Sequence, residues 1–220
     1  MSHELRTPLN AILGFTGTIL MGLPGPLNDE QARQLRTVQT NGRHLLSLIN
    51  DLLDLARIES GKLELSLESI DGQGLLEEVA VGLSPLAHEK GLELSVVPSA
   101  ARPQVCSDRR LLRQILINLA NNAIKFTDRG GIRMRISREL KDDRSVTRFA
   151  VIDTGRGIKP GDQARLFAAF EQIDSSPSHH SEGTGLGLYI SQMLAGSIGA
   201  SITFQSEFGR GSTFTLELAE

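Results

Sequence analysis

The sequence predicts an α+β fold in which an antiparallel helical hairpin is followed by an α/β sandwich with a mixed, largely antiparallel sheet. Up to residue 60, apolar residues recur at alternating steps of three and four, the period of a helix that packs on another helix. From Lys62 onward the pattern changes to alternating polar and apolar residues, and segments with strand and helix periods follow. We therefore expect two domains, 1–61 and 62–220.

The first domain is predicted to contain two helices, one over residues 5–20 and a longer one that ends near Ser60. The glycine- and proline-rich segment 22–27 separates them, and Asn28 or Asp29 can cap the second helix. Two helices with wide apolar faces do not bury them alone, so we expect two hairpins to associate into a dimeric four-helix bundle. Packing of the hairpin on its own second domain is the alternative.

The second domain is predicted to alternate between strands and helices. Leu63, Leu65 and Leu67 alternate with polar residues, which predicts a first strand there, and Asp108 is a suitable N-cap for a helix over 109–126. The other predicted helices cover residues 74–90, 164–170 and 186–198, and the other predicted strands cover 92–97, 104–106, 131–139, 146–153, 200–206 and 212–218.

The composition is that of an ordinary globular protein and excludes several kinds of partner. Of 220 residues, 40% are hydrophobic and 22% are charged, and the net charge of −3 does not favour nucleic acid. No run approaches the roughly 18 apolar residues that span a bilayer, so we expect no membrane contact by this chain and a cytoplasmic location. The single cysteine, Cys106, is expected to be a small buried residue in a reducing compartment.

A glycine-rich turn is the first of several segments suited to a nucleotide. Gly183, Gly185 and Gly187 open the backbone just before a predicted helix. Unpaired N–H groups and the positive end of the helix would then face an anion such as a phosphate. A turn that only leads into a helix is the alternative for this motif taken alone.

Two asparagines and a lysine share one predicted helix. Asn118 and Asn122 lie four residues apart on one face, and Lys125 follows three residues later. Amide oxygens suit Mg²⁺, and a lysine head suits phosphate groups. Exposed amides on an ordinary helix are the alternative.

An aspartate ends a strand that the sequence predicts to be buried. Asp153 supplies an acceptor for an amino group such as that of adenine, and Gly155 and Gly157 allow the backbone to approach a ring closely. A simple turn after the strand is the alternative.

These segments occur in one order over essentially the whole chain. The order is His3-Glu4-Leu5-Arg6-Thr7-Pro8, then residues 118–127, then Asp153-Thr154-Gly155-Arg156-Gly157-Ile158, then Gly183-Thr184-Gly185-Leu186-Gly187-Leu188. It resembles the order in the histidine kinases of two-component signalling. The hairpin resembles their dimerisation and histidine-phosphotransfer domain, and the second domain resembles their ATP-binding catalytic domain, which has the Bergerat fold of gyrases and chaperones.

The resemblance implies a role for each of these residues. His3 would be the phosphoacceptor, Glu4 its base or orienting acceptor, and Thr7 the residue that orients water for dephosphorylation of the partner. ATP and Mg²⁺ would be bound with Asn122 as the metal ligand. The other implied nucleotide-binding residues are Asn118, Lys125, Phe126, Asp153, Gly155, Gly157, Gly183, Thr184, Gly185, Leu186 and Gly187. The implied partners are a second copy of the chain and the receiver domain of a response regulator, whose aspartate would accept the phosphoryl group.

Two stretches are expected to depart from this pattern. The polar segment 171–182 is predicted to be a mobile lid, with Phe167 and Phe170 anchoring its base. It carries His179 and His180 where the family often has Arg or Lys, so we expect the charge of the lid to vary between about pH 6 and 7.5.

The second departure lies at the beginning of the chain. Because Pro8 fits a first helical turn and Thr7 can cap it, the helix is expected to start there and leave His3 in a frayed segment. The chain is thus expected to be a fragment of a longer kinase. Two rival functions are an ATPase of the same fold without phosphotransfer, and a dimeric scaffold with a vestigial pocket.

Overall fold

The computed structural model describes the whole chain except residues 1, 61–62, 142–143, 172–184 and 220. The described chain divides into two compact units, one within residues 1–61 and the other within residues 62–173 and 185–220. None of the described helices is both long enough and apolar enough to cross a membrane.

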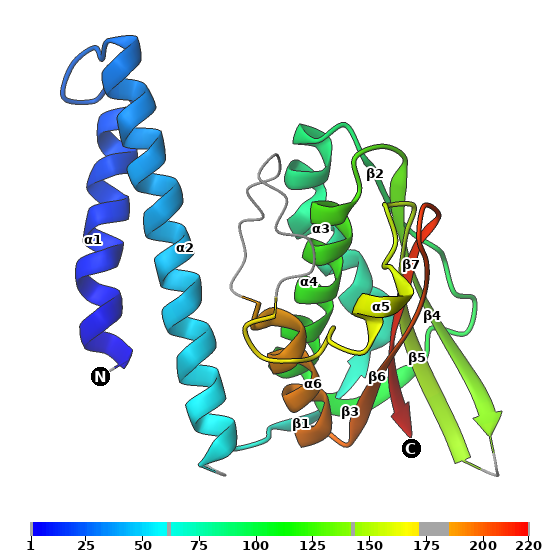
Figure 1. Ribbon diagram of the computed structural model, residues 1–220. Helices are drawn as coiled ribbons and strands as arrows, with labels where there is room; N and C mark the ends of the chain where they lie inside the picture. The colour runs from blue at the N-terminus through cyan, green and yellow to red at the C-terminus, as the bar shows by residue number, and fades with distance from the viewer. Residues whose placement is uncertain (1, 61–62, 142–143, 172–184, 220) are drawn as a thin grey trace. The chain divides into compact units, whose positions relative to one another are not determined.

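The first unit is a hairpin of two helices, α1 (Ser2–Leu20) and α2 (Asp29–Glu59) (Figure 1). Helix α1 begins at Ser2 rather than at Thr7, so the expectation of a frayed His3 is wrong. Pro8 lies inside this helix, where it removes the N–H that would otherwise donate to the carbonyl of Glu4, so α1 lacks one hydrogen bond near its start. Asn28 is the N-cap of α2 and forms a capping box with Gln31.

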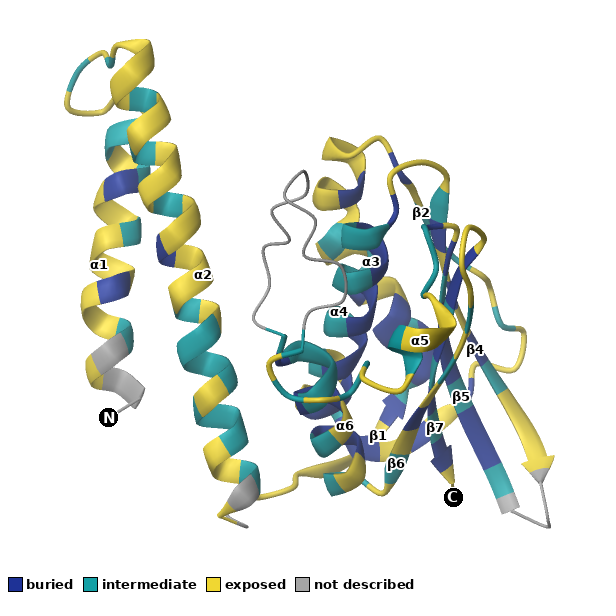
Figure 2. Cartoon of the chain, viewed as in Figure 1, coloured by how far each residue is buried: buried dark blue, intermediate teal, exposed yellow. Residues whose placement is uncertain are grey.

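The helices of the hairpin approach each other closely at Gly42. A Cβ there would lie 2.8 Å from a terminal methyl of Leu13, so the hydrogen of glycine makes room for the leucines of α1. Leu9 and Thr16 of α1 are buried at this contact. Outside the contact most of the hairpin surface is exposed (Figure 2).

A second apolar stripe on α2 remains exposed within the hairpin. Val38, Leu45 and Leu52 follow one another at intervals of seven residues, and each is nearly half exposed. Ile12 of α1 is exposed to the same degree. The single hairpin therefore buries only part of the apolar face that the heptad pattern predicts.

The second unit contains a five-stranded mixed sheet in the order β2-β4-β5-β7-β6. Its strands are β2 (Glu93–Val96), β4 (Gly131–Lys141), β5 (Arg144–Asp153), β6 (Ala200–Glu207) and β7 (Gly211–Ala219). Only the β2–β4 pair is parallel. This confirms the prediction of an α+β chain with a mixed, largely antiparallel sheet.

Three helices cover one face of this sheet: α3 (Gly72–Glu89), α4 (Arg109–Phe126) and α6 (Gly187–Ser197) (Figure 1). The buried residues lie between the two layers (Figure 2), and the largest that are fully buried are Phe149, Ile70, Leu75, Leu76, Leu112, Ile115, Leu116, Leu119, Ile124, Ile132, Met134 and Leu186. A two-stranded antiparallel sheet of β1 (Leu67–Asp71) and β3 (Gln104–Asp108), together with the short helix α5 (Pro160–Gln163), completes the unit.

The prediction of a strand over 63–67 is wrong, since β1 begins at Leu67. Leu67 pairs with Asp108, the final residue of β3, and the chain then turns into α4. Among the described strands none lies opposite residues 63–66, and the N–H of Ser66 instead donates to the Asp108 carboxylate at 3.0 Å. Leu65 and Leu67 consequently remain exposed.

Two smaller expectations also fail. Cys106 is exposed rather than buried, because β3 is covered on one face only and Val105 and Ser107 point into the core. The segment 164–170 forms successive turns instead of a helix. Its Phe170 has a φ of 63° and is exposed, so it does not anchor the segment that follows, whereas Phe167 packs on the ring of Phe204.

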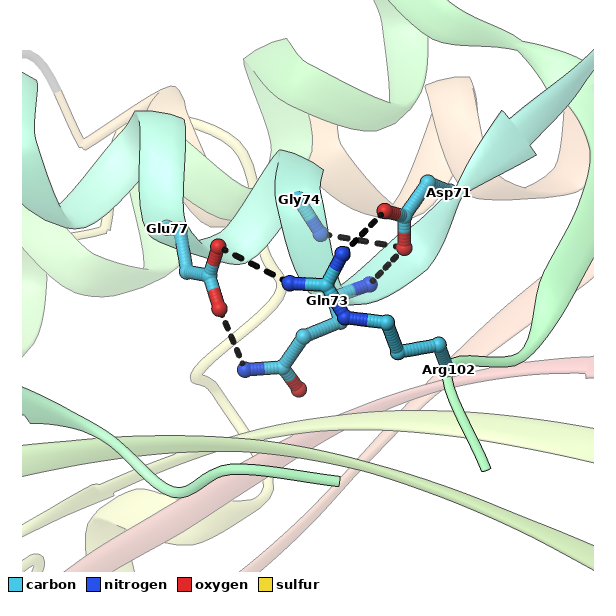
Figure 3. A network of polar contacts seen from close by, with 5 residues as sticks. All are labelled: Asp71, Gln73, Gly74, Glu77 and Arg102. Carbon is cyan, nitrogen blue, oxygen red and sulfur yellow. Dashed lines mark hydrogen bonds and ion pairs between the residues drawn. The ribbon is translucent and has the colours of Figure 1, made fainter. Parts of the chain in front are cut away.

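The start of α3 is held by a polar network with Arg102 at its centre (Figure 3). The carboxylate of Asp71 caps α3 by accepting from the N–H groups of Gln73 and Gly74. The Arg102 guanidinium contacts Asp71 at 3.3 Å and Glu77 at 3.6 Å, and Gln73 also donates to Glu77. The loop before β3 is thereby joined to the first turn of α3.

Candidate functional site

The site begins with Asp153, which ends β5 at the edge of the core. Only 8% of the residue is exposed, and its Oδ1 accepts from the N–H of Gly155 at 2.8 Å and from that of Ser212 at 3.2 Å. Among the described residues no hydrogen bond reaches Oδ2. Burial raises the pKa of this carboxyl above its ordinary value, and the two N–H groups oppose that rise. The arrangement fixes one oxygen and leaves the other as an acceptor.

The glycines that follow Asp153 allow two close backbone contacts. A Cβ at Gly155 would overlap the carbonyl oxygen of Phe126, and one at Gly157 would overlap that of Glu207. Gly157 also has a φ of 65°, which disfavours any other residue. The loop is therefore held between the end of α4 and the turn that joins β6 to β7.

The β6–β7 turn is a part of the site that sequence reasoning missed. The N–H of Ile158 donates to Ser206 Oγ at 2.8 Å, and the N–H of Gly209 donates to the carbonyl of Arg156 at 2.7 Å. Gly211 has a φ of 115°, and a Cβ there would overlap the backbone of Asp153. The residues of the turn lie between two predicted strands and belong to none of the motifs; the glycines Gly209 and Gly211 were the signal available in the sequence.

Helix α4 brings the two asparagines and the lysine to the same end of the unit. Asp108 caps the helix as predicted, with Oδ1 accepting from Leu111 N–H at 3.1 Å. Asn118 donates through Nδ2 to Ser191 Oγ of α6 at 2.7 Å, so part of its amide is already occupied. Asn122 and Lys125 lie half-buried further along the helix.

Phe126, at the end of α4, lies between two cations. Lys125 Nζ is 4.9 Å and the Arg156 guanidinium carbon 5.0 Å from the centre of its ring. The N–H of Arg156 also donates to the Phe126 carbonyl at 3.3 Å. These contacts join the end of α4 to the loop after Asp153.

The start of α6 lies against α4 as well. Gly187 packs so closely on Asn118 that a Cβ would be 2.6 Å from Oδ1, and Leu186 is fully buried. Gly185 has a φ of 69° and its carbonyl accepts from the N–H of Phe170 at 3.1 Å. No described side chain caps α6, and the first N–H groups of a helix have no acceptor within the helix and favour an anion.

Some of the remaining predicted site residues lie in parts of the chain that the structure does not describe. The structure does not describe Gly183 and Thr184. It also leaves out the predicted lid, including His179 and His180, except for Glu171. In the first unit, the backbone of His3 is helical and its side chain lies outside the description, while Glu4 and Thr7 are exposed on the same helix. The structure thus brings together the predicted residues at the ends of β5 and α4 and at the start of α6.

Two family models match the chain. Residues 107–220 match the family described as histidine kinase-, DNA gyrase B-, and HSP90-like ATPase, and residues 1–61 match the His Kinase A (phospho-acceptor) domain. The chain belongs to the histidine kinases, with the phospho-acceptor segment preceding the ATPase segment. This confirms the resemblance inferred from the order of the motifs.

Similar curated proteins carry the same description. The chain is 43% identical to the signal transduction histidine-protein kinase BarA of Escherichia coli over 97% of its length, and 42% identical to the sensor protein GacS of Pseudomonas syringae over 99%. The circadian input-output histidine kinase CikA of Synechococcus elongatus is 40% identical. The chain spans 23%, 24% and 29% of these proteins, respectively.

Solved structures place the fold in the same family. The structure of full-length ShkA in complex with AMPPNP superimposes with a TM-score of 0.78 at 40% identity, covering 99% of this chain and 44% of that one. The histidine kinase AdeS of Acinetobacter baumannii gives a TM-score of 0.63 at 27% identity, covering 99% of this chain and 97% of that one. The second unit accordingly has the Bergerat fold.

Proposed function

We propose that the chain is the catalytic core of a sensor histidine kinase. Residues 62–220 bind ATP with Mg²⁺, the γ-phosphoryl group passes to His3, and an aspartate of a response-regulator receiver domain then accepts it. Residues 1–61 carry the phosphoacceptor and the dimer contact. Because the chain corresponds to about a quarter of BarA and GacS, the signal-input part would belong to a longer protein.

The observation that carries this proposal is the geometry of Asp153. A buried carboxylate with Oδ1 held by two N–H groups presents a fixed acceptor in Oδ2, which is what recognition of an exocyclic amino group requires. Gly155 and Gly157 leave room for an adenine ring beside it, and Phe126 supplies an apolar surface. The related ShkA was solved in complex with AMPPNP, which supports nucleotide binding by this chain.

The phosphates would lie between α4 and α6. Lys125 and Asn118 would contact them from α4, while the N–H groups at the start of α6 would donate from the other side. Asn122 fits Mg²⁺, because this ion takes few protein oxygens and completes its shell with waters and phosphate oxygens. When bound there, the ion would neutralise charge on the phosphates.

The transfer step uses residues of the first unit. A neutral imidazole nitrogen of His3 attacks the γ-phosphorus, the bond to the β–γ bridging oxygen breaks, and ADP leaves with the electron pair. Glu4 orients the imidazole and takes its proton. Thr7 lies one helical turn beyond His3. It would orient water for the opposing phosphatase activity, in which the phosphoryl group is removed from the regulator by hydrolysis.

Dimerisation follows from the exposed stripe of α2. Val38, Leu45 and Leu52 form a seam that a second hairpin would bury in a four-helix bundle. We place the activity in the cytoplasm, where ATP is supplied, and the longer parent protein could be anchored in a membrane.

The test is incubation of the chain with γ-labelled ATP and MgCl₂, with the His3→Gln variant alongside. We expect label that survives base, is lost in acid, and is absent from His3→Gln, which is the behaviour of a phosphoramidate. The control variant is His44→Gln, which changes the other histidine of the hairpin and should leave labelling intact.

The remaining outcomes separate the rival functions. Release of labelled phosphate without labelled protein would favour an ATPase without phosphotransfer. Absence of both label and nucleotide binding would favour the scaffold. Label that persists in His3→Gln would exclude His3 as the acceptor.

A further inference from the structure

A lysine outside every predicted motif reaches the end of α4. Lys90 directly follows α3, and its Nζ donates to the carbonyls of Ile124 at 2.9 Å, Lys125 at 2.9 Å and Thr127 at 3.3 Å. An ammonium has three donor hydrogens, so all of them are directed at this one turn. The contact joins residues 34 to 37 positions apart in the chain.

With Lys90, every carbonyl at the end of α4 has a partner. Thr127 Oγ1 donates to the carbonyl of Ala123 at 2.7 Å, and the N–H of Arg156 donates to that of Phe126. The other three carbonyls, those of Ile124, Lys125 and Thr127, accept from Lys90 Nζ. The final carbonyls of a helix otherwise have no partner within the helix and carry its negative end, so a cation there is favourable.

We propose that Lys90 is a positioning residue of the nucleotide site: it holds the last turn of α4 so that Lys125 and Phe126 keep the orientation that nucleotide binding requires. This inference rests on the proposed function of the second unit. The remainder of α4 is fixed by its buried leucines and isoleucines, whereas Lys125 and Phe126 are only half-buried. Their orientation therefore depends on how firmly the backbone of this turn is held.

Lys90 also affects a second part of the site, the loop after Asp153, through the last turn of α4. The carbonyl between those held by Lys90, that of Phe126, accepts from the loop after Asp153. If the turn unwinds, Lys125 moves relative to the phosphates and the Asp153 loop loses its contact with α4. Small displacements of positioning groups are known to be costly, on the order of a hundredfold for about 1 Å in an active site.

The experiment compares the whole chain with Lys90→Met and Lys90→Arg. Methionine keeps most of the length of the side chain and removes the donors, whereas arginine keeps a charge and donors. We expect Lys90→Met to weaken the binding of ADP with MgCl₂ on the order of tenfold by calorimetry. We expect Lys90→Arg to recover most of that loss.

Two controls separate positioning from charge and from general stability. Arg133→Met removes a positive charge from an exposed position on β4, and Ile136→Val loosens the core at a distance from the turn. Both should bind ADP as the parent does. Suppose that Ile136→Val lowers Tm as much as Lys90→Met does and also weakens ADP binding as much. The loss of binding in Lys90→Met would then come from lower stability, and the proposal would fail.

Amide hydrogen exchange gives a second readout that needs no nucleotide. In Lys90→Met the amides of residues 122–127 should exchange faster than in the parent, while those of 111–119 should not change. Equal exchange together with equal ADP affinity would overturn the proposal. If the parent itself does not bind ADP, the proposed function fails, and the exchange data still decide whether Lys90 holds the turn.

Discussion

At the scale of single residues, Asp153 combines two requirements that oppose each other. Its burial raises the pKa of the carboxyl, which disfavours the charged form, yet recognition of an amino group requires an acceptor. The N–H groups of Gly155 and Ser212 both donate to Oδ1 and stabilise the charge. A proton taken up by this residue would consequently go to Oδ2 and convert the free acceptor into a donor.

The variant Asp153→Asn tests this arrangement. Its amide oxygen can still accept from both N–H groups, but an NH₂ group replaces the free acceptor. We expect a loss of ADP affinity of at least about a hundredfold, because a donor would then face the amino group of adenine. Glu93→Gln makes the same chemical change at an exposed position of β2 and should leave calorimetric binding as it is in the parent.

The same variant predicts a pH dependence of stability. Because the pKa of Asp153 is raised by folding, the parent loses stability as pH rises through that pKa, whereas the asparagine variant has no such loss. The free energy of unfolding of Asp153→Asn, relative to the parent, should therefore increase between about pH 4 and pH 7. The measurement is urea titration at several pH values. If the difference in free energy of unfolding between the two proteins stays constant over this range, folding does not raise the pKa of Asp153.

At the scale of elements, the β6–β7 turn supports the loop that follows β5. Gly211 approaches the backbone of Asp153, and Ser212 supplies one of the two N–H groups on its carboxylate. Ser206 Oγ holds Ile158 at the other end of the loop. The β6–β7 turn therefore supports both ends of the loop that follows β5.

Two glycines of this turn provide a matched pair of variants. Both Gly209 and Gly211 have positive φ, of 87° and 115°, so alanine at either position strains the backbone by about 1 to 2 kcal/mol. Only at Gly211 would the new Cβ also overlap the backbone of Asp153, since nothing lies within 4 Å of one at Gly209. We expect Gly211→Ala to lower the free energy of unfolding by at least about 2 kcal/mol more than Gly209→Ala. ADP affinity should fall only in Gly211→Ala, and equal affinities would show that the turn does not shape the site.

At the scale of the whole molecule, the proposed dimer can be tested at the exposed stripe of α2. Leu45→Glu with Leu52→Glu places two charges in the seam that a second hairpin would cover. Because burying a leucine contributes about 1.5 to 3 kcal/mol, sedimentation should show a monomer at concentrations where the parent is a dimer. Arg43→Glu introduces the same charge at an exposed polar position and should remain dimeric. ADP binding should be equal in all three proteins, and a double variant that stays dimeric would place the interface elsewhere.

The sequence predicted those elements whose boundaries are set by their own side chains, such as a capping residue or a regular apolar spacing. Helix α4 begins and ends where the Asp108 cap and the apolar period place it, Gly155 donates to Asp153, and Asn118 contacts α6. The predicted strand over 63–67 failed because pairing depends on a partner strand, and the partner ends at Asp108. An alternating pattern within one segment holds no information about that partner.

The supports of the site escaped prediction for a different reason. Ser212 donates through its backbone N–H and Lys90 donates to backbone carbonyls, so one end of each contact is a main-chain group that the sequence does not mark. Lys90 and Ile124 are also far apart in sequence. Only the folded backbone shows that a lysine after α3 meets the end of α4.

The position of β7 has a consequence for the order in which the protein is made. Strand β7 lies between β5 and β6 in the sheet although it follows both in the sequence. When the chain has been synthesised only through β6, all the predicted binding motifs have been made, yet Ser212, which holds Asp153, is still absent. Nascent chains should therefore be unable to retain nucleotide until β7 has emerged and inserted, and mutations that slow this insertion would leave an incomplete sheet exposed to proteases.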